Sequence, residues 1–430
     1  MTQTNENLAI FGGPRAVTLD QTQANRWPII TGEDEEAVMA VLRDGDLSMH
    51  RVTRDLEDDY RHYLGVRHAL AHCNGTAALL AAFFALGLKP GDEVLVPSAT
   101  HWASVVPLLW VGAVPVFCES ELERQGVDPI DAKRKITSKT RAIVVVHLWG
   151  MPSKMTELME LAREHNLKII EDASHAPGAV WRGRKCGTLG DVAVFSLQTS
   201  KLVPAGEGGI LLTNDYEAYE RSLCFGDVMR IIELESPAKR LAATSFGMKT
   251  RMAPLSAAVA RVQLSRLEER NEKRNGNLTY LSEELEKLGC DTFLPPTHVK
   301  RVYFEFLIRV NPKLLPISLE RLVEALSAEG CDISYPRYPL LHQQPLFTEG
   351  LFRNIGAFAQ LPDSELPSYL PDALPKTEEA SRMLIRLPTF PSAEMPLLRQ
   401  YAVAFQKVVS QSERLAPAKG ASARLEGQGS

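Results

Sequence analysis

The sequence lacks the features that mark secreted, membrane and metal-binding proteins. Its six cysteines form no CxxC pair and no spacing typical of metal ligands, which predicts reduced thiols in a cytoplasmic protein. The opening residues, MTQTNENLAI, have no basic region followed by a long apolar core, so we expect no signal peptide. The longest apolar run, 77–88, is too short to span a bilayer. The chain also has no internal repeat.

The charge balance argues against two further classes of partner. A net charge of −5 gives no overall positive field, so neither nucleic acid nor an anionic membrane is an expected partner. Hydrophobic residues at 45% and charged residues at 23% are typical of a soluble globular protein. A chain of 430 residues exceeds the usual size of one core, so we expect two domains.

Between residues 68 and 214 the chain alternates short apolar runs with helical segments. This alternation predicts an α/β fold with a mostly parallel sheet flanked by helices, because parallel neighbours need a crossover between them. The predicted strands are 68–75, 93–98, 114–120, 141–150, 167–174 and 192–200, and the predicted helices are 76–88, 104–112, 128–136 and 154–166.

The alternation stops near residue 214, and a smaller α+β domain is expected beyond it. Residues 255–289 are rich in helix formers and predict one long connecting helix with Gly276 as its weak point. The segment 301–310 predicts a strand, and 318–330 predicts a helix. The expected organisation is an N-terminal arm (1–26), a large domain (27–275), a small C-terminal domain (276–412) and a tail (413–430) whose small, polar residues indicate disorder.

Lys201 stands in an unusual setting for a lysine. It follows the apolar run VAVFSLQTS and precedes a glycine-rich turn, which predicts burial and a close backbone approach. Asp172 ends another apolar run and should lie at the carboxyl edge of the sheet, where open α/β folds bind ligands. A lysine and an acid so placed can hold pyridoxal phosphate through a Schiff base and the pyridine nitrogen. The alternatives are a solvated lysine and an aspartate that forms a turn or caps a helix.

Other residues near these strand ends fit the same site. Gly75 and Thr76 lie where a strand enters a helix, and exposed amides at a helix N-terminus favour an anion. The alternative for Thr76 is a simple helix cap. Ser196 and Gln198 can add hydrogen bonds or be polar residues of a strand surface. His175 can contact the ring phenolate or fill the core.

Five motifs follow one another along the chain: NGTAAL (74–79), VPSATHWAS (96–104), EDASHAPGA (171–179), GTLGDVAVFSLQTSK (187–201) and GEGGILLTND (206–215). In this order they resemble the DegT/DnrJ/EryC1/StrS aminotransferases, pyridoxal-phosphate enzymes of fold type I that aminate keto-sugars and keto-cyclitols. The resemblance extends from about residue 27 to about residue 405. The opening LAIFGGPRAVT and the run SLQTSK…GEGGI are most similar to the members that aminate scyllo-inosose and related cyclitols.

The resemblance implies a role for each matched residue. Lys201 would carry the cofactor as a Schiff base, and Asp172 would bind the pyridine nitrogen. Gly75, Thr76 and Ser196 are the matched residues that would hold the phosphate.

Two histidines depart from the pattern that many relatives share. His175 replaces a glutamine that usually lies beside the ring. The aromatic residue that stacks on the cofactor in many members is matched by His101, with Trp102 one residue later. Either ring can stack, and His101 is our preferred choice.

Another departure lies in the segment 246–264. Where many relatives have Asn-Tyr-Arg, this chain has Lys249, Thr250 and Arg251. The relatives' Asn contacts the phosphate across the dimer interface, which implies a homodimer with shared active sites. Lys249 can serve the same anion, or it and Arg251 can contact substrate. The alternative is a salt bridge within the interface.

The segment 334–347 of the smaller domain resembles a family loop near the substrate pocket. A polyhydroxylated ketone needs several hydrogen-bonding groups, and Tyr335, Arg337, Tyr338 and His342 can supply them. Proline-rich loops of this kind also serve as packing elements.

We therefore expect an aminotransferase that moves an amino group from L-glutamine or L-glutamate to a keto-cyclitol or keto-sugar, in aminoglycoside-type or other secondary metabolism. Lys201 would act as base and then acid, with ping-pong kinetics. Same-fold alternatives make aminated aromatic acids or dehydrate sugars, and Lys201 argues against the dehydratase because that branch replaces this lysine. A non-catalytic cofactor-binding regulator has less need for Lys201.

Overall fold

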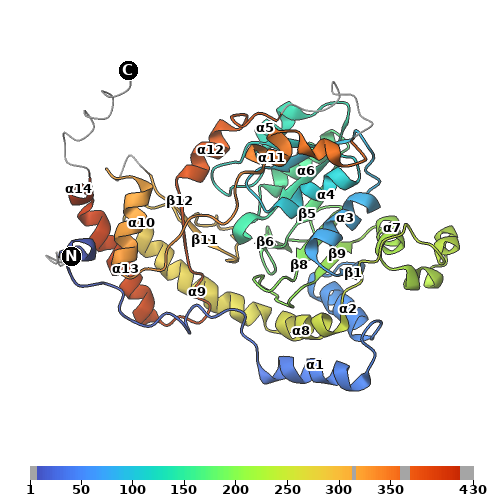
Figure 1. The fold of residues 1–430 in the computed structure, drawn as a ribbon, viewed down its shortest axis with the longest axis horizontal. Helices are drawn as coiled ribbons and strands as arrows, with labels where there is room; N and C mark the ends of the chain where they lie inside the picture. Colours follow the sequence, from blue (N-terminus) through green and yellow to red (C-terminus); the bar gives the residue numbers. More distant parts are fainter. Residues whose placement is uncertain (1–6, 312–315, 359–368, 417–430) are drawn as a thin grey trace.

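A seven-stranded sheet forms the centre of the larger part of the molecule (Figure 1). The computed structural model describes residues 7–311, 316–358 and 369–416. The strand order is β1-β9-β8-β5-β4-β2-β3; the strands from β8 to β3 run parallel, and β9 is antiparallel to both neighbours. The mostly parallel α/β sheet expected from the sequence is confirmed. Its strands are β1 His68–His72, β2 Glu93–Pro97, β3 Val114–Cys118, β4 Thr140–Val146, β5 Lys168–Asp172, β8 Val192–Ser196 and β9 Gly209–Thr213.

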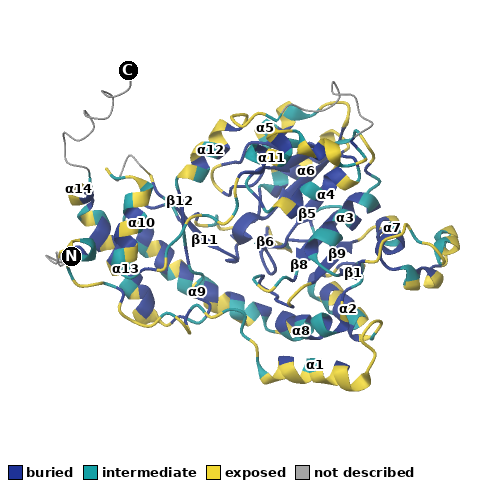
Figure 2. Ribbon diagram, viewed as in Figure 1, coloured by how far each residue is buried: buried dark blue, intermediate teal, exposed yellow. Residues whose placement is uncertain are grey.

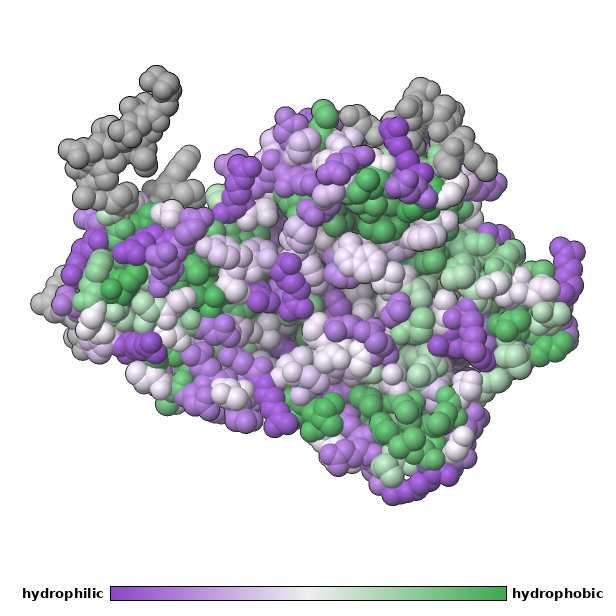
Figure 3. Space-filling model, viewed as in Figure 1, coloured by the Kyte–Doolittle hydropathy of each residue, from purple (hydrophilic) through white to green (hydrophobic). Residues whose placement is uncertain are grey.

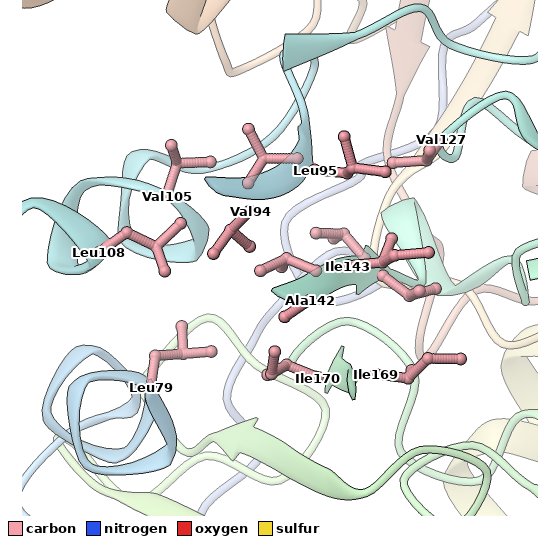
Figure 4. Close-up of a cluster of buried hydrophobic side chains, with 14 of the residues drawn as sticks. Leu79, Val94, Leu95, Val105, Leu108, Val127, Ala142, Ile143, Ile169 and Ile170 are labelled. Atoms are coloured by element: carbon pink, nitrogen blue, oxygen red, sulfur yellow. The ribbon is translucent and has the colours of Figure 1, made fainter. Parts of the chain in front are cut away.

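Helices cover both faces of this sheet. Side chains alternate between the two faces along each strand, and apolar side chains on both faces need to be buried. Along β8, Val192 and Val194 join one buried cluster, whereas Ala193 and Phe195 join another. Figure 4 shows the first cluster, in which Leu79 packs with strand residues such as Val94 and Ile170. The helices of this part are α1 Gly32–Asp44, α2 Val52–Leu64, α3 Gly75–Ala85, α4 Val106–Trp110, α5 Pro129–Lys135, α6 Met155–Glu164, α7 Tyr216–Gly226 and α8 Pro254–Ser265.

The predicted helix 255–289 is two helices, α8 and α9 Leu267–Glu286. The break falls at Arg266 and not at Gly276, which lies inside α9. The Ser265 hydroxyl donates to the Val262 carbonyl at 2.8 Å, a local bond that competes with the helix ladder. A lone glycine among good helix formers costs only about 1 kcal/mol, so α9 continues through it.

The smaller part of the molecule packs around a two-stranded antiparallel sheet, β11 Phe306–Arg309 with β12 Leu384–Leu387. The predicted strand 301–310 is thus regular only in its second half. Before it, Val302 and Phe304 donate their backbone N–H groups to Gly150 and Trp149 of the larger part. The remaining elements are β6 Val180–Trp181, β7 Arg184–Lys185, β10 Val299–Lys300, α10 Leu319–Ala328, α11 Pro345–Thr348, α12 Pro375–Arg382, α13 Met395–Ser410 and α14 Ser412–Leu415.

The N-terminal arm packs against the smaller part. Leu8 and Val17 belong to the same buried cluster as the residues of α10, α13, β11 and β12. Glu329 is fully buried and accepts hydrogen bonds from the backbone N–H groups of Ala9 and Ala16 and from Lys407 Nζ. A buried carboxylate paired in this way fixes the course of the arm.

The proposed division at residue 275 falls within α9 and stays a prediction. Of the predicted tail, the first residues belong to α14, and residues 417–430 lie outside the described residues. All six cysteines are free. No helix in the described ranges is long and apolar enough to cross a membrane.

Candidate active site

A cavity of about 920 Å³ opens at the carboxyl edge of the central sheet, beside the N-terminus of α3. Its position is the one expected for a ligand site in an open α/β sheet. The structure brings most of the predicted site residues together there. Those that line the cavity are Gly75, Thr76, His101, Trp102, Asp172, His175, Ser196, Gln198, Lys201, Arg337 and Tyr338.

Lys201 is the buried amine of this cavity, with 8% of its surface exposed. Its backbone N–H donates to the Gln198 carbonyl at 2.7 Å, and its carbonyl accepts from the Trp27 indole at 3.1 Å. Its Nζ lies 4.3 Å from the centre of the Phe304 ring. Burial lowers the pKa of Lys201 from 10.5 to about 8, although the charge of Asp172 opposes this shift. The neutral, nucleophilic fraction of the amine near neutral pH is therefore far larger than it would be at the ordinary lysine pKa.

Asp172 ends β5 and is buried at the floor of the cavity. Its carboxylate accepts the Ser104 hydroxyl at 2.6 Å and the Ser174 backbone N–H at 3.1 Å. A carboxylate has about four acceptor positions, so it retains capacity for a further donor such as a protonated pyridine nitrogen.

The N-terminus of α3 forms an anion cradle against β8. The Asn74 side chain caps the helix by accepting the Ala77 N–H at 2.8 Å, so the cap is Asn74 and not Thr76. A Cβ added at Gly75 would lie 2.8 Å from Ser196 Cβ, so only glycine permits this approach of helix to strand. The helix amides and the Ser196 hydroxyl together suit a phosphate.

An aromatic cluster surrounds His175 at one side of the cavity. The His175 imidazole stacks on Phe304 at 4.1 Å and on Trp149 at 5.6 Å between ring centres. Its Nδ1 accepts the Trp149 backbone N–H at 3.3 Å, and its Nε2 faces the Tyr338 hydroxyl at 3.4 Å. Burial holds the pKa of His175 well below 6.5. His175 is therefore neutral, with its proton on Nε2.

The two candidate stacking residues differ in exposure. Burial also lowers the pKa of His101, whose ring meets that of Tyr338 edge-on at 5.3 Å. Trp102 is 48% exposed at the cavity mouth. The choice between these two rings as the one that stacks on a cofactor stays a prediction.

Four predicted residues do not line the cavity. His342 is buried behind the wall, where its ring contacts Ser98 Oγ at 2.6 Å and Glu378 at 3.3 Å. Arg251 faces Asp227 at 3.9 Å. Lys249 is exposed on the surface. Tyr335, of the loop 334–347, is also exposed.

The sequence did not point to Ser104, Ser174, Trp149 or Phe304. The two serines stand close after predicted site residues in the chain, and their hydroxyl groups were the feature of the sequence that could have indicated a role in the site. Trp149 and Phe304 meet His175 from segments far apart in the chain, so no local pattern indicates that contact.

These features fit pyridoxal phosphate. The α3 cradle suits the phosphate, Asp172 has acceptor capacity for the pyridine nitrogen, and Lys201 offers a desolvated amine for the aldehyde. The glycine at 75 in particular leaves space that a side chain would fill.

Substitution of Gly75 tests the cradle. A methyl group at Gly75→Ala would push α3 from β8, so we expect affinity for pyridoxal phosphate to fall by about tenfold. Absorbance titration of the apoprotein measures this affinity. Gly32→Ala is the matched control, because a Cβ there meets no atom within 4 Å. Equal affinity in both variants would contradict the cradle.

The pH dependence of cofactor capture tests the state of Lys201. Only the neutral amine attacks an aldehyde, and its fraction rises as the pH rises through the pKa. We expect the rate of pyridoxal phosphate capture by the apoprotein to increase with a midpoint near pH 8. Stopped-flow absorbance over a pH series measures it. A midpoint near the ordinary lysine value of 10.5 would show that the amine is solvated.

The chain is similar to curated relatives over most of its length. It is 32% identical over 356 residues to "L-glutamine:scyllo-inosose aminotransferase" of Streptomyces griseus, covering 78% of this chain and 82% of the relative. It is 33% identical over 322 residues to "GDP-perosamine synthase" of Caulobacter vibrioides, covering 74% and 85%.

Solved structures of aminotransferases are also similar to this chain over most of its length. The aminotransferase from Psychrobacter cryohalolentis superposes with a TM-score of 0.81 at 25% identity, covering 90% of this chain and 99% of that one. DesV of S. venezuelae superposes with a TM-score of 0.75 at 31% identity, covering 93% and 99%. Residues 28–396 match the family described as the DegT/DnrJ/EryC1/StrS aminotransferase family. The fold, the cofactor site and these matches agree with the family expected from the motifs, and the chain belongs to the pyridoxal-phosphate-dependent DegT/DnrJ/EryC1/StrS aminotransferases.

Proposed function

We propose that this enzyme transfers the amino group of L-glutamine to the ketone of a polyhydroxylated ring, a keto-cyclitol or keto-sugar, in the biosynthesis of a secondary metabolite. The buried amine of Lys201 carries this proposal, because it shares one cavity with the Asp172 carboxylate and the α3 cradle. The names of relatives support the donor and the acceptor class: "L-glutamine:2-deoxy-scyllo-inosose aminotransferase" of Micromonospora echinospora, 30% identical over 399 residues, is one of them.

The proposed keto acceptor is a class of compounds and not a single compound. Relatives named for cyclitols and for nucleotide-linked sugars match this chain at similar identity. L-Glutamate is the alternative donor. The six free cysteines are consistent with a cytoplasmic enzyme.

Bound pyridoxal phosphate supplies an electron sink that stabilises negative charge on the substrate carbon next to the nitrogen. The protein supplies the proton transfers and the positioning. Asp172, held by Ser104 and Ser174, would bind the pyridine nitrogen and keep it protonated. Lys201 Nζ would hold the cofactor by its aldehyde and, when free, would act as the base that takes the proton from the substrate carbon and as the acid that delivers it to the carbon on the other side of the nitrogen.

The low pKa of Lys201 makes this proton transfer effective in both directions near neutral pH, because the base and acid forms are both populated. His175 presents its Nε2–H as a neutral donor and adds no positive charge beside the amine. The rings of Trp149, Phe304 and Tyr338 stack with the His175 imidazole and fix its position. L-Glutamine and the ketone use the site in turn, which gives ping-pong kinetics.

We also propose a homodimer with shared active sites. Lys249 does not line the cavity of its own chain, and it is exposed. Figure 3 shows hydrophobic surface gathered at the bottom of the view, where Figure 1 draws α1 and α8. Exposed apolar side chains on and beside α1 include Met39, Leu42, Leu47 and Met49, and much of α1 is exposed in Figure 2. A surface of this kind suits a second copy of the chain.

The visible absorbance of the purified enzyme tests the reaction. L-Glutamine should remove the band of the lysine-bound cofactor, and a keto-cyclitol or keto-sugar should restore it. Lys201→Ala should have no such band and no turnover. Unchanged absorbance of the cofactor-saturated enzyme with L-glutamine would contradict the proposal.

Mixing two inactive variants tests the shared site. If Lys249 reaches the partner's phosphate, Lys201→Ala and Lys249→Ala subunits should together form one intact site per mixed dimer. After subunit exchange we expect about a quarter of the wild-type activity, measured as glutamine-dependent turnover. Lys249→Arg, which retains the charge, is the control and should remain active. Failure of the mixture to regain activity, with mixed dimers confirmed by mass spectrometry, would place Lys249 outside the partner's site.

A further inference from the structure

A second cavity of about 350 Å³ adjoins the active site. It shares Ser200 and Arg337 with the main cavity. We call it the Trp27 annex and define it by Asn25, Trp27, Glu305, Ser334, Arg337 and Arg386, which line it with Ser200 and Phe304. Its volume lies in the usual range for small-molecule sites. The sequence analysis did not indicate this cavity.

Glu305 is the central charge of the annex, and it is 3% exposed. Its Oε1 accepts Arg337 Nε at 2.7 Å and Arg386 Nη1 at 3.2 Å. Its Oε2 is buried, and among the described residues it has no hydrogen-bond partner. A buried carboxylate oxygen in this state costs about 1–3 kcal/mol unless a donor reaches it.

Asn25 adds a second acceptor of the same kind. Its Oδ1 is buried and has no hydrogen-bond partner within the described part of the chain. Asn25 and Glu305, the residues that carry these two unsatisfied acceptors, line one small cavity, which indicates a ligand that brings hydrogen-bond donors.

The arginines restrict which donors fit. A cation would face Arg337 and Arg386, and a carboxylate has no proton to donate to Glu305. A hydroxyl group both donates to the free oxygens and accepts from a guanidinium N–H. The rings of Trp27 and Phe304 provide apolar surface for the carbon skeleton that carries the hydroxyls.

The annex also lies close to the reacting amine. The centre of the Phe304 ring, next to Glu305 in the chain, lies 4.3 Å from Lys201 Nζ. The Trp27 indole donates a hydrogen bond to the Lys201 carbonyl. Glu305 and Arg337 both act on the pKa of Lys201 through their charges, in opposite directions. A ring whose ketone reaches Lys201 can therefore extend into the annex.

We propose that the Trp27 annex binds the hydroxyl groups of the keto acceptor that lie away from the reacting ketone. Glu305 accepts hydrogen bonds from these hydroxyl groups and so determines which keto substrate the enzyme prefers. This inference rests on the proposed aminotransfer to a polyhydroxylated ketone. Glu305 and Asn25 then bind the keto substrate and not the amino donor.

The two half-reactions separate the annex from the rest of the site. The test compares wild-type holoenzyme with Glu305→Gln and Asn25→Ala, and the pyridoxamine form reacts with scyllo-inosose in stopped-flow absorbance. We expect the half-saturating scyllo-inosose concentration to rise by about tenfold in Glu305→Gln. The half-reaction with L-glutamine should change much less than the acceptor half-reaction, and in Asn25→Ala, which keeps the charge of Glu305, it should change by less than about twofold. Glu324→Gln, an exposed carboxylate of α10, is the matched control.

Calorimetric titration with scyllo-inositol, which has no ketone, gives a readout independent of turnover. The wild type should bind it, and Glu305→Gln should lose most of this binding. Asn25→Ala leaves the Glu305–arginine pairs intact and should weaken binding in the same direction, which covers the case of a Glu305→Gln variant that does not fold.

Each contrary result has one meaning. A wild type that does not react with L-glutamine contradicts the proposed function. A wild type that reacts with both substrates, but whose variants lose both half-reactions equally, contradicts the acceptor role of the annex. Unchanged acceptor kinetics, or no scyllo-inositol binding to the wild type, would overturn the proposed acceptor role of the annex.

Discussion

Removing the Lys201 amine from water is the constraint on which the rest of the site depends. Desolvation disfavours the charged form strongly enough to lower the pKa of the amine, even though the Asp172 carboxylate favours that form. Asp172 is itself engaged by Ser104 and Ser174. Burial of the amine needs three parts of the chain, because the segment after β8 supplies Lys201, the N-terminal region supplies Trp27 and the segment before β11 supplies Phe304.

Glu171 and Asp172, the adjacent acids at the end of β5, have different roles: one stabilises the fold and the other lines the active site. Glu171 is fully buried and accepts hydrogen bonds from His147 and from the backbone N–H groups of Gly187, Leu189 and Gly190. It therefore fixes the segment that leads into β8. Asp172, one residue later, lines the cavity. Because successive side chains point to opposite faces, neighbouring carboxylates serve the scaffold and the site separately.

The sequence predicted the parts of the site that depend on local order. Asp172, Ser196 and Lys201 follow apolar strands, and the parallel sheet brings such strand ends to one edge. It also predicted the family, which the comparisons confirm. The position of His342 could not be predicted, because its burial depends on Ser98 and Glu378, which are distant in the chain. The contact of Phe304 with His175 and the pairing of Glu305 with two arginines are equally non-local.

Helix formers predicted the presence of α8 and α9 but not the break between them. Gly276 carried the stronger local signal, whereas the interruption follows Ser265 and its bond to Val262. Intrinsic propensity is a weak guide at such a point, because side-chain bonds and the burial of Leu264 and Leu267 decide where the chain turns.

The hydrogen bond from Trp27 to Lys201 joins the N-terminal segment to the reacting lysine. The arm is fixed to the smaller part by Leu8, Val17 and Glu329, and Trp27, the residue that follows it, holds the Lys201 carbonyl. A single stretch of about twenty residues therefore connects the buried core of the smaller part with the backbone of the residue that carries the chemistry.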